Sequence, residues 1–366
     1  MKVGGWDNIC FSFSKSLLSM SVRFFLLFLI VCLAPSPLMA AKGKAAPRND
    51  LSKRIEVQAW ATEFGAREGI DSEFLLDSLK SAKIESRIIE LMDAPAKAPP
   101  LWFEYAPRFL NEKRISNGVV FWSDNEAVLT RAQTYFGVPP EVIVAIIGIE
   151  THYGRNVGGF RVLDALATLA FDYPRRADYF RGELEEFFLL ALDNSFAPTA
   201  PKGSYAGAMG VGQFMPRSYR HYAIDFDGDG RIDLWQTPDA IGSVAFYLKE
   251  HGWQTGAPIL IPLQPLSELS SETATALAPY LDNNPSDPQP WKQWRALGVK
   301  LTDANTVIDD NTAATLLSLD AESGPTYSLA FDNFRVILRY NKSRLYAAAV
   351  AHLAEAIKAR RSAVAP

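Results

Sequence analysis

Apolar residues recur at helical spacing along much of the first third of the chain. Between Ser52 and Met92 they return every three or four positions, as they do on one face of an α-helix. Three prolines between residues 95 and 100 break this pattern, and the aromatic run LWFEYAPRF after them favours an extended or loop segment. Residues 123–136 predict another helix, with Ser123 as a suitable N-cap.

A longer apolar run follows from Val142 to Ile149, and it has no polar face. It begins after Pro139-Pro140-Glu141, where proline is tolerated and a glutamate suits the positive end of a helix dipole. Because a helix that is apolar on all sides is buried, we expect a buried helix here, with Gly154 as its C-cap. Further helices are predicted at 161–172, 175–192, 238–251 and 333–360.

Residues 255–322 differ from the rest of the chain in composition. They are rich in Pro, Ser, Thr and Asp and contain short alternating runs such as APILIP at 257–262. We therefore expect an inserted, partly β subdomain there, within a fold that is mainly α and of the α+β class.

The composition is that of a globular protein with a real core, since 48% of the 366 residues are apolar and 21% are charged. The N-terminus differs, because Arg23 precedes an apolar run at 24–33 and the small residues Ala40-Ala41 come after two prolines. This pattern predicts a signal peptide at 1–41 and a linker at 42–51, with a membrane anchor as the alternative. We expect an exported, periplasmic protein, which is membrane-associated if the leader is retained.

Both cysteines, Cys10 and Cys32, lie in this leader, so the exported part would have no disulfide and no catalytic thiol. The leader carries a net charge of +2, which leaves −6 on the remainder of a chain whose total is −4. A mildly acidic chain without a basic run offers no binding surface for nucleic acid, and we exclude that partner.

A glutamate closes the buried helix, in the segment GIETHYG at 148–154. Near the helix C-terminus, the helix dipole and the apolar surroundings both disfavour a negative charge on Glu150. Both effects raise the pKa of a carboxyl, and an acid that stays protonated near neutral pH suits general acid catalysis. The alternative is a structural glutamate that caps a neighbouring helix or pairs with Arg155.

The stretch GSYAGAMGVGQFMPRSY at 203–219 contains too much glycine for a core strand. Its mixture of glycine with Met209, Gln213 and Phe214 suits the floor of a groove that hydrogen-bonds a polymer.

Three segments, ETHYGR, LATLAFDYPRRADYF and GAMGVGQFMPRSY, together resemble the family B lytic murein transglycosylases, which form glycoside hydrolase family 103. The resemblance continues through DFDGDGRIDLW, DAIGSVAFYLKEHGW and FRVILRYNKSRLYAAAV, and it covers roughly residues 52–356. Several long motifs in a fixed order are more specific than one active-site pattern.

The resemblance implies a goose-lysozyme-like helical catalytic core with a flanking helical domain and a small β-containing insertion. Residues 52–254 would form the catalytic region, residues 255–322 the subdomain, and residues 323–366 a helical part that returns to the core.

By the same resemblance, Glu150 is the catalytic acid and base, and the substrate is the glycan strand of peptidoglycan. Residues expected to bind that strand are Ser204, Gln213, Tyr105, Tyr247, Tyr340 and Tyr346, together with Met209 of the glycine-rich stretch and Arg175 and Arg176, which would face peptide or lactyl carboxylates. For any tyrosine alone, the alternative is core packing with a bonded hydroxyl, and it is stronger for Tyr247, which lies in a predicted helix.

Ordinary glycosidases use two carboxylates, but Glu150 and Asp164 are the only acids within residues 142–170. The resemblance implies that one acid suffices. Glu150 would protonate the oxygen between N-acetylmuramic acid and N-acetylglucosamine while the substrate's N-acetyl oxygen stabilises C1. It would then take the proton of the C6 hydroxyl, which attacks C1 and closes a 1,6-anhydro ring without water.

Residues 225–239 have a spacing close to that of an EF-hand loop, with oxygens at alternate positions and a glycine at the sixth. Gln236 stands where the closing glutamate is expected, and the resemblance supplies Asp239 for that role. The expected ligands of a structural Ca²⁺ or Na⁺ ion are Asp225, Asp227, Asp229, the Arg231 carbonyl and Asp239. A solvated acidic turn is the alternative, and no cofactor is expected for the chemistry.

Two other functions stay open at this point: a hydrolytic muramidase on the same scaffold, and a non-catalytic, calcium-stabilised module that binds peptidoglycan. A zinc peptidase is disfavoured because the four histidines lack the required spacing. We expect a monomer whose main partner is the peptidoglycan glycan strand, with cell-wall synthesis or remodelling proteins as further partners.

Overall fold

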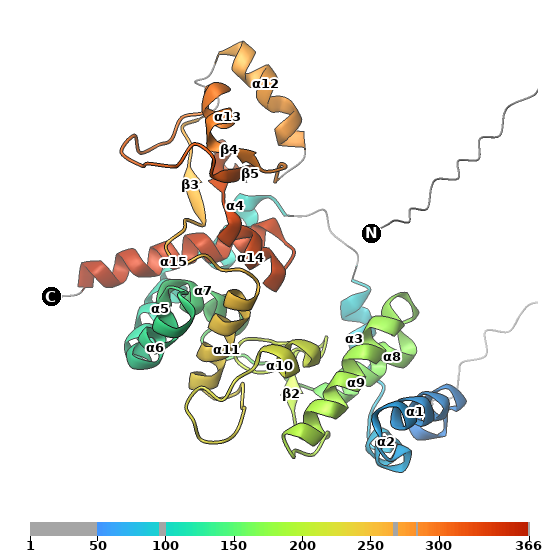
Figure 1. Ribbon diagram of the computed structural model, residues 1–366. Helices are drawn as coiled ribbons and strands as arrows, with labels where there is room; N and C mark the ends of the chain where they lie inside the picture. The colour runs from blue at the N-terminus through green and yellow to red at the C-terminus, as the bar shows by residue number, and fades with distance from the viewer. Residues whose placement is uncertain (1–49, 95–99, 266–269, 283–284, 365–366) are drawn as a thin grey trace, which may run out of the picture. The chain divides into compact units, whose positions relative to one another are not determined.

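The computed structural model describes residues 50–94, 100–265, 270–282 and 285–364. The expected signal peptide and nearly all of the linker lie outside these residues. Residues 48–366 form one compact unit that is mostly helical, which confirms the mainly α fold (Figure 1). Its helices are α1 (Ile55–Glu68), α2 (Ser72–Lys80), α3 (Ser86–Met92), α4 (Trp102–Tyr105), α5 (Glu112–Asp124), α6 (Glu126–Phe136), α7 (Pro140–Thr151), α8 (Val162–Asp172), α9 (Ala177–Asp193), α10 (Pro216–Tyr222), α11 (Thr237–Glu250), α12 (Ser271–Asp282), α13 (Trp291–Ala296), α14 (Asp332–Tyr340) and α15 (Arg344–Val364).

The apolar helix predicted after Pro139 is α7, and it lies in the main core. Every residue from Pro140 to Gly148 is buried, and the helix packs against α5 and α15 (Figure 1). One apolar cluster runs from Leu51 to Ile357, so segments from both ends of the described chain close around α7. No single helix in the described residues is long and apolar enough to span a membrane, although α6 and α7, joined at a bend of 114°, pass that test as a pair.

Two local expectations are wrong. The run LWFEYAPRF is helical, because the Leu101 amide donates to the Glu104 carboxylate at 3.0 Å and this bond closes the first turn of α4. Ser123 is not an N-cap, because it lies inside α5. The break between α5 and α6 falls at Asn125, whose amide donates to the carbonyls of Phe121 and Trp122.

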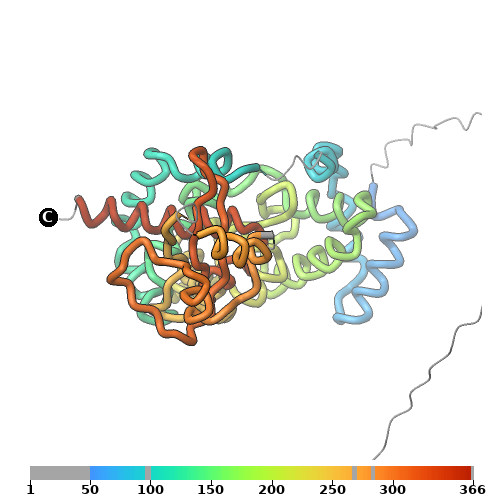
Figure 2. The backbone as a smooth tube through the Cα atoms, turned by 90° about the horizontal axis from the view of Figure 1, so that it is seen from above, coloured from blue at the N-terminus to red at the C-terminus, as the bar shows by residue number. Residues whose placement is uncertain are grey.

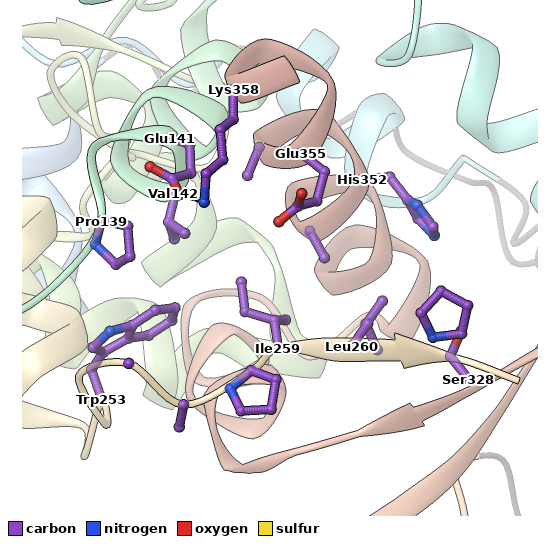
Figure 3. Close-up of a pocket in the computed structure, with 16 residues that line it drawn as sticks. Pro139, Glu141, Val142, Trp253, Ile259, Leu260, Ser328, His352, Glu355 and Lys358 are labelled. Atoms are coloured by element: carbon purple, nitrogen blue, oxygen red, sulfur yellow. Dashed lines mark ion pairs between the residues drawn. The ribbon is translucent and has the colours of Figure 1, made fainter. Parts of the chain in front are cut away.

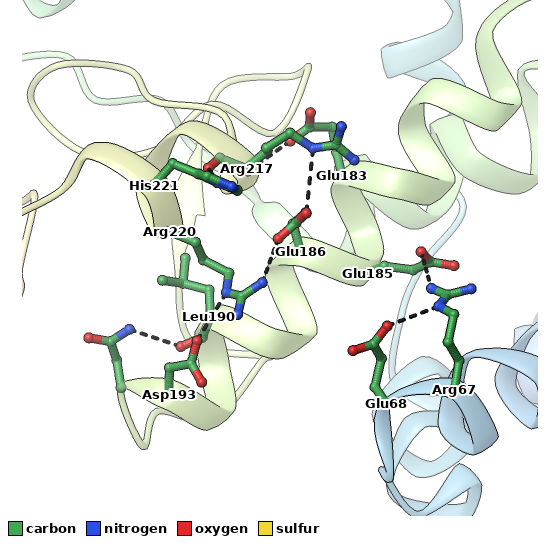
Figure 4. Close-up of polar contacts among 11 residues, drawn as sticks. Arg67, Glu68, Glu183, Glu185, Glu186, Leu190, Asp193, Arg217, Arg220 and His221 are labelled. Atoms are coloured by element: carbon green, nitrogen blue, oxygen red, sulfur yellow. Dashed lines mark hydrogen bonds and ion pairs between the residues drawn. The ribbon is translucent and has the colours of Figure 1, made fainter. Parts of the chain in front are cut away.

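Helix α9 connects the flanking N-terminal helices to α10 through polar side chains on its surface (Figure 4). On one side, Glu185 accepts hydrogen bonds from Trp60 and Arg67 of α1, at 3.1 and 2.6 Å. On the other, Glu186 pairs with Arg220 of α10 at 2.7 Å. Since α8 packs along α9, these contacts fix the flanking helices to the core.

The described β-structure includes a four-stranded antiparallel sheet in the order β3-β6-β5-β4. Strands β5 and β6 form a hairpin in which pairing runs from Thr315 opposite Ala330 to Ala321 opposite Gly324. The sheet therefore continues past residue 322, where we expected the subdomain to end, because β6 supplies the partner that β5 needs. The strands are β3 (Leu260–Pro262), β4 (Gln289–Pro290), β5 (Ala313–Ala321) and β6 (Gly324–Ala330), and a separate short pair joins β1 (Phe160–Arg161) to β2 (Lys202–Gly203).

Strand β5 is buried on both faces, which is unusual for a small antiparallel sheet. Ala314 and Leu316 belong to a second apolar cluster centred on Trp294, inside the subdomain (orange in Figure 2). Leu317 and Leu319 belong to the main core instead. Because successive side chains of a strand point to opposite faces, β5 separates the two cores and contacts both.

Candidate active site

Helix α7 ends in a tight turn that begins two residues after Glu150. His152 and Tyr153 both adopt positive φ, at 53° and 63°, and the amides of these two residues bond back to carbonyls of the last turn. The expectation that Gly154 caps the helix is wrong, because the cap is His152. The turn folds the Tyr153 ring over Gly148, where an added Cβ would lie 2.7 Å from the ring, so this position requires glycine.

A buried arginine holds this turn from outside. The Arg114 side chain is 4% exposed and donates to the Gly148 carbonyl in the last turn of α7, while its backbone carbonyl accepts the Tyr153 hydroxyl at 2.8 Å. Its Nη2 also lies 2.6 Å from Nε2 of His152. No carboxylate among the described residues pairs with this guanidinium, so its charge faces the negative end of the α7 dipole. Sequence reasoning missed Arg114, because NEKRISNG gives no sign that the arginine is buried.

The carboxyl of Glu150 lies partly buried among tyrosines. Burial raises its pKa to about 7, and a hydrogen bond from the Tyr346 hydroxyl to Oε1, at 2.6 Å, opposes part of that rise. Glu150 makes no ion pair with Arg155 within the described residues, so the structural alternative is not realised there. A carboxyl in this state can give up a proton near neutral pH and take it back.

Four tyrosines were expected at the site, and three of them lie close enough to sense the Glu150 charge. The pKa of Tyr105, Tyr340 and Tyr346 is raised in each case, first by burial and then by that negative charge. The Tyr340 hydroxyl donates to the Gly212 carbonyl at 2.5 Å.

Tyr247 stands behind this group. It is 8% exposed, its hydroxyl donates to the Arg339 carbonyl at 2.7 Å, and its ring packs edge-on against Tyr340. Most of the Tyr247 side chain is therefore packed in the core with a bonded hydroxyl, which is the alternative to substrate binding that the sequence left open. It still lines a cavity of about 70 Å³ together with Gln213, Phe214, Met215, Ser218 and Tyr340.

The glycine-rich stretch forms a tight loop that is tied to the end of α7. Thr151, the residue after Glu150, donates its hydroxyl to the Val211 carbonyl at 2.8 Å. Inside the loop, the Ser204 hydroxyl accepts from the Ala208 amide at 3.0 Å. An added Cβ on Gly203 would lie 2.1 Å from the Ala208 carbonyl oxygen, which explains the glycine there.

Two predicted groove residues in this loop behave differently. Gln213 has φ of 55° and donates its side-chain amide to the Gly210 and Val157 carbonyls, at 2.9 and 3.1 Å. These contacts leave its amide oxygen as an acceptor at the cavity. Met209 is completely buried, so the prediction that it contacts substrate is wrong in this conformation, and the side chain packs in the core instead.

Arg175 and Arg176 lie in the 3-10 turn between α8 and α9, and no contact in the described residues joins them to Glu150. Arg175 is exposed and pairs with Asp93, and Arg176 lies over the ring of Tyr179 at 4.5 Å. Their expected contact with substrate carboxylates stays a prediction.

No second carboxylate in the described part of the chain contributes to the pKa shift of Glu150. Asp164, the one other acid nearby in sequence, is buried in α8, where it pairs with Arg161 at 2.6 Å and accepts the Lys83 amide at 2.9 Å. Its oxygens are occupied, so the site offers one acid rather than the usual pair.

The loop before α11 brings three of the expected cation ligands together. Carboxylate oxygens of Asp225, Asp227 and Asp229 lie within 4.8 Å of one another. Asp239 is buried in the first turn of α11 and accepts the amides of Phe226 and Asp233, both at 2.8 Å, so it supports the loop from below. The acidic oxygens suit a hard cation such as Ca²⁺.

The chain matches known proteins over most of its length. A family model described as the transglycosylase SLT domain matches residues 53–355. Membrane-bound lytic murein transglycosylase B of Escherichia coli (strain K12) is 42% identical over 317 residues, 84% of this chain and 84% of that protein.

Solved structures agree with these matches. Catenated lytic transglycosylase SltB1 from Pseudomonas aeruginosa aligns with a TM-score of 0.77 and 41% identity, over 85% of this chain and 100% of that one. Escherichia coli lytic transglycosylase Slt35 in complex with calcium aligns with a TM-score of 0.75 and 40% identity, over 86% of this chain and 96% of that one. The chain therefore belongs to the transglycosylase SLT domain family and is a lytic transglycosylase, an enzyme that cleaves peptidoglycan.

Proposed function

We propose that Glu150 performs both proton transfers when this enzyme cleaves the bond between N-acetylmuramic acid and N-acetylglucosamine. The observation that carries the proposal is a partly buried carboxyl that accepts the Tyr346 hydroxyl at 2.6 Å and has no acidic partner within the described residues; burial raises its pKa to about 7. At neutral pH about half of such groups are protonated, which suits a residue that acts first as acid and then as base.

In the first step, protonated Glu150 donates to the glycosidic oxygen as its bond to C1 breaks. The resulting carboxylate keeps its hydrogen bond from Tyr346, which stabilises the charge that has just formed. The substrate's N-acetyl oxygen stabilises C1, so no second carboxylate is required. Glu150 then accepts the proton of the C6 hydroxyl as that oxygen attacks C1, and the product is a 1,6-anhydromuramic acid end.

The neighbouring groups supply positioning. Gln213 and Tyr340 meet at the small cavity beside Glu150's tyrosines, where an amide oxygen and an aromatic face suit an acetamido group and a sugar ring. Ser204 keeps the glycine-rich loop in shape through the Ala208 amide, so its contribution to substrate binding would be indirect.

We also propose that the acidic loop binds Ca²⁺ and that the ion has a structural role. Support comes from the three clustered carboxylates and from the calcium complex of Slt35. The proposed ligands are Asp225, Asp227, Asp229, the Arg231 carbonyl and Asp239. The first three carboxylates already lie together, and Asp239 accepts the Phe226 amide and so also holds the loop against α11.

For location, we propose a periplasmic enzyme that is exported by the leader at 1–41. The support is its membership in a family that acts on peptidoglycan, together with the leader pattern in the sequence.

The test is digestion of purified sacculi by the wild type and by Glu150→Gln, with the released muropeptides analysed by mass spectrometry. We expect anhydro ends, lighter than reducing ends by one water, from the wild type and none from the variant. Reducing ends would instead indicate a muramidase. A folded Glu150→Gln protein with normal turnover would refute the assignment of Glu150.

A further inference from the structure

The two ends of α7 differ in how the charged groups around them are compensated. In the first turn, Glu141 pairs with Lys358 of α15 at 2.9 Å, on the wall of a cavity of about 500 Å³ (Figure 3). At the other end, Arg114 of α5 contacts the turn that contains Glu150, and no carboxylate among the described residues pairs with it. A buried cation without a counter-ion is costly, because the protein interior solvates a charge poorly.

The cost of burying Arg114 is visible in its ionisation and in its hydrogen bonds. The side chain is buried, and that burial lowers the pKa of its guanidinium. Its Nε is also buried, without a hydrogen-bond partner in the described part of the chain. An apolar side chain of similar size would avoid both costs. The stability of the fold alone therefore does not account for an arginine at this position.

The contacts of Arg114 lie on both sides of Glu150 along the chain. Its Nη1 donates to the Gly148 carbonyl, two residues before Glu150. Its Nη2 lies 2.6 Å from Nε2 of His152, two residues after Glu150. The backbone carbonyl of Arg114 also accepts the Tyr153 hydroxyl, at 2.8 Å. One residue of α5 thus holds the end of α7 that contains Glu150 at three points.

The contact with His152 requires a neutral imidazole. A guanidinium can only donate hydrogen bonds, so Nε2 of His152 must accept, and the ring proton is on Nδ1. Burial lowers the pKa of His152, and the charges of Arg114, Lys113 and Arg155 lower it further, so the ring is neutral at pH 7. The rigid fork of an arginine holds this nitrogen and the Gly148 carbonyl together, which the single ammonium of a lysine could not do.

We propose that Arg114 is a positioning residue, which fixes the last turn of α7 so that the Glu150 carboxyl stays within reach of the glycosidic oxygen. This inference rests on the proposed function of Glu150. Arg114 makes no hydrogen bond with that carboxyl within the described residues, so it acts through the backbone of the turn. The carboxyl itself is held by the Tyr346 hydroxyl at 2.6 Å, a contact that a small rotation of the turn would break. A displacement of about 1 Å at a reacting group can cost about a hundredfold in rate.

The test compares cleavage of purified glycan strands by the wild type, Arg114→Met and Arg114→Lys, with rates normalised to the folded fraction from urea unfolding. Methionine keeps an apolar stem but removes every donor, and lysine keeps the charge without the fork. We expect kcat to fall about a hundredfold in Arg114→Met and about tenfold in Arg114→Lys, with KM within about twofold of the wild type, because only the acid is displaced. The matched control is Arg54→Met, which removes a buried arginine that pairs with Asp172 at 2.8 Å; its kcat should equal that of the wild type.

A wild-type kcat in either folded Arg114 variant would overturn the proposal, as would a rise in KM at unchanged kcat or an equal fall of kcat in Arg54→Met. If Arg114→Met does not fold, Arg114→Lys alone provides the test. Glu150→Gln, assayed beside these variants, separates this inference from the proposed function. If Glu150→Gln is inactive while the Arg114 variants cleave normally, only the positioning role is wrong. If Glu150→Gln cleaves normally, both are wrong.

Discussion

Replacement of Glu150 by glutamine should make the protein more stable at neutral and alkaline pH while it removes activity. Burial disfavours the charged form of this carboxyl, so ionisation of Glu150 lowers the free energy of unfolding of the enzyme. Glutamine has nearly the same shape, cannot ionise, and retains an oxygen that can accept the Tyr346 hydroxyl.

The size of the gain follows from the pKa of about 7 in the folded protein and 4.5 as the ordinary value. Below pH of about 4.5 the carboxyl is protonated in both the folded and the unfolded states, and it costs nothing. Between these two values the unfolded chain releases its proton first, so the free energy of unfolding falls as pH rises. Above pH of about 7 the cost is complete, and the difference between these two pKa values corresponds to about 3 kcal/mol.

The assay is urea unfolding of the wild type and Glu150→Gln from pH 4 to pH 9, with the difference in unfolding free energy plotted against pH. We expect that difference to grow in favour of the variant between about pH 4.5 and pH 7 and then to stay level. A difference that is flat across this range, or one that shifts toward the wild type, would refute the claim that burial raises the pKa of Glu150.

Three further predictions concern the same site and the loop beside it. Tyr346→Phe removes the hydrogen bond that stabilises the Glu150 carboxylate, so the pKa of Glu150 should rise by about one to two units and the alkaline limb of the pH–rate profile should move to higher pH. Tyr340→Phe is the control: the Tyr340 hydroxyl bonds a backbone carbonyl, so its loss should move that limb much less. Gly148→Ala places a methyl group 2.7 Å from the Tyr153 ring and should cost about 1–3 kcal/mol in urea unfolding, although alanine is the better helix former; an unchanged midpoint would show that the ring can move aside. Ca²⁺ at about 100 times its Kd should stabilise the protein by about 2.7 kcal/mol, which a chelator reverses; equal melting temperatures with Ca²⁺ and with chelator would show that the EF-hand-like loop has no structural cation.

The sequence predicted those features that depend on periodic burial. The run from Val142 to Ile149 is apolar on every side, and α7 is buried on every side. The same pattern predicted that apolar surroundings raise the pKa of Glu150, as burial does in the structure, whereas its catalytic role was inferred from the family resemblance. The mainly helical fold and the family were predicted from several long motifs, and the order of these motifs along the chain can be recognised without knowledge of the tertiary structure.

Features that depend on a contact between distant segments escaped prediction. The sequence around Arg114 gives no sign of burial, and only the packing of α5 against α7 buries it. The C-cap moved from Gly154 to His152 because the Tyr153 ring needs the space above Gly148, which is a tertiary requirement. Met209 looked like a groove residue because its glycine neighbours did, but its own side chain fills the core.

The double-sided burial of β5 limits how this architecture can be rearranged. Leu316 and Leu317 are adjacent in sequence yet belong to different cores. Removal of the subdomain would leave a cavity in the main core where Leu317 and Leu319 pack. Transfer of the subdomain to another relative would place these side chains against helices that they do not match. Evolution can therefore lengthen the loops around this hairpin freely, while the hairpin itself must change in step with both of its neighbours.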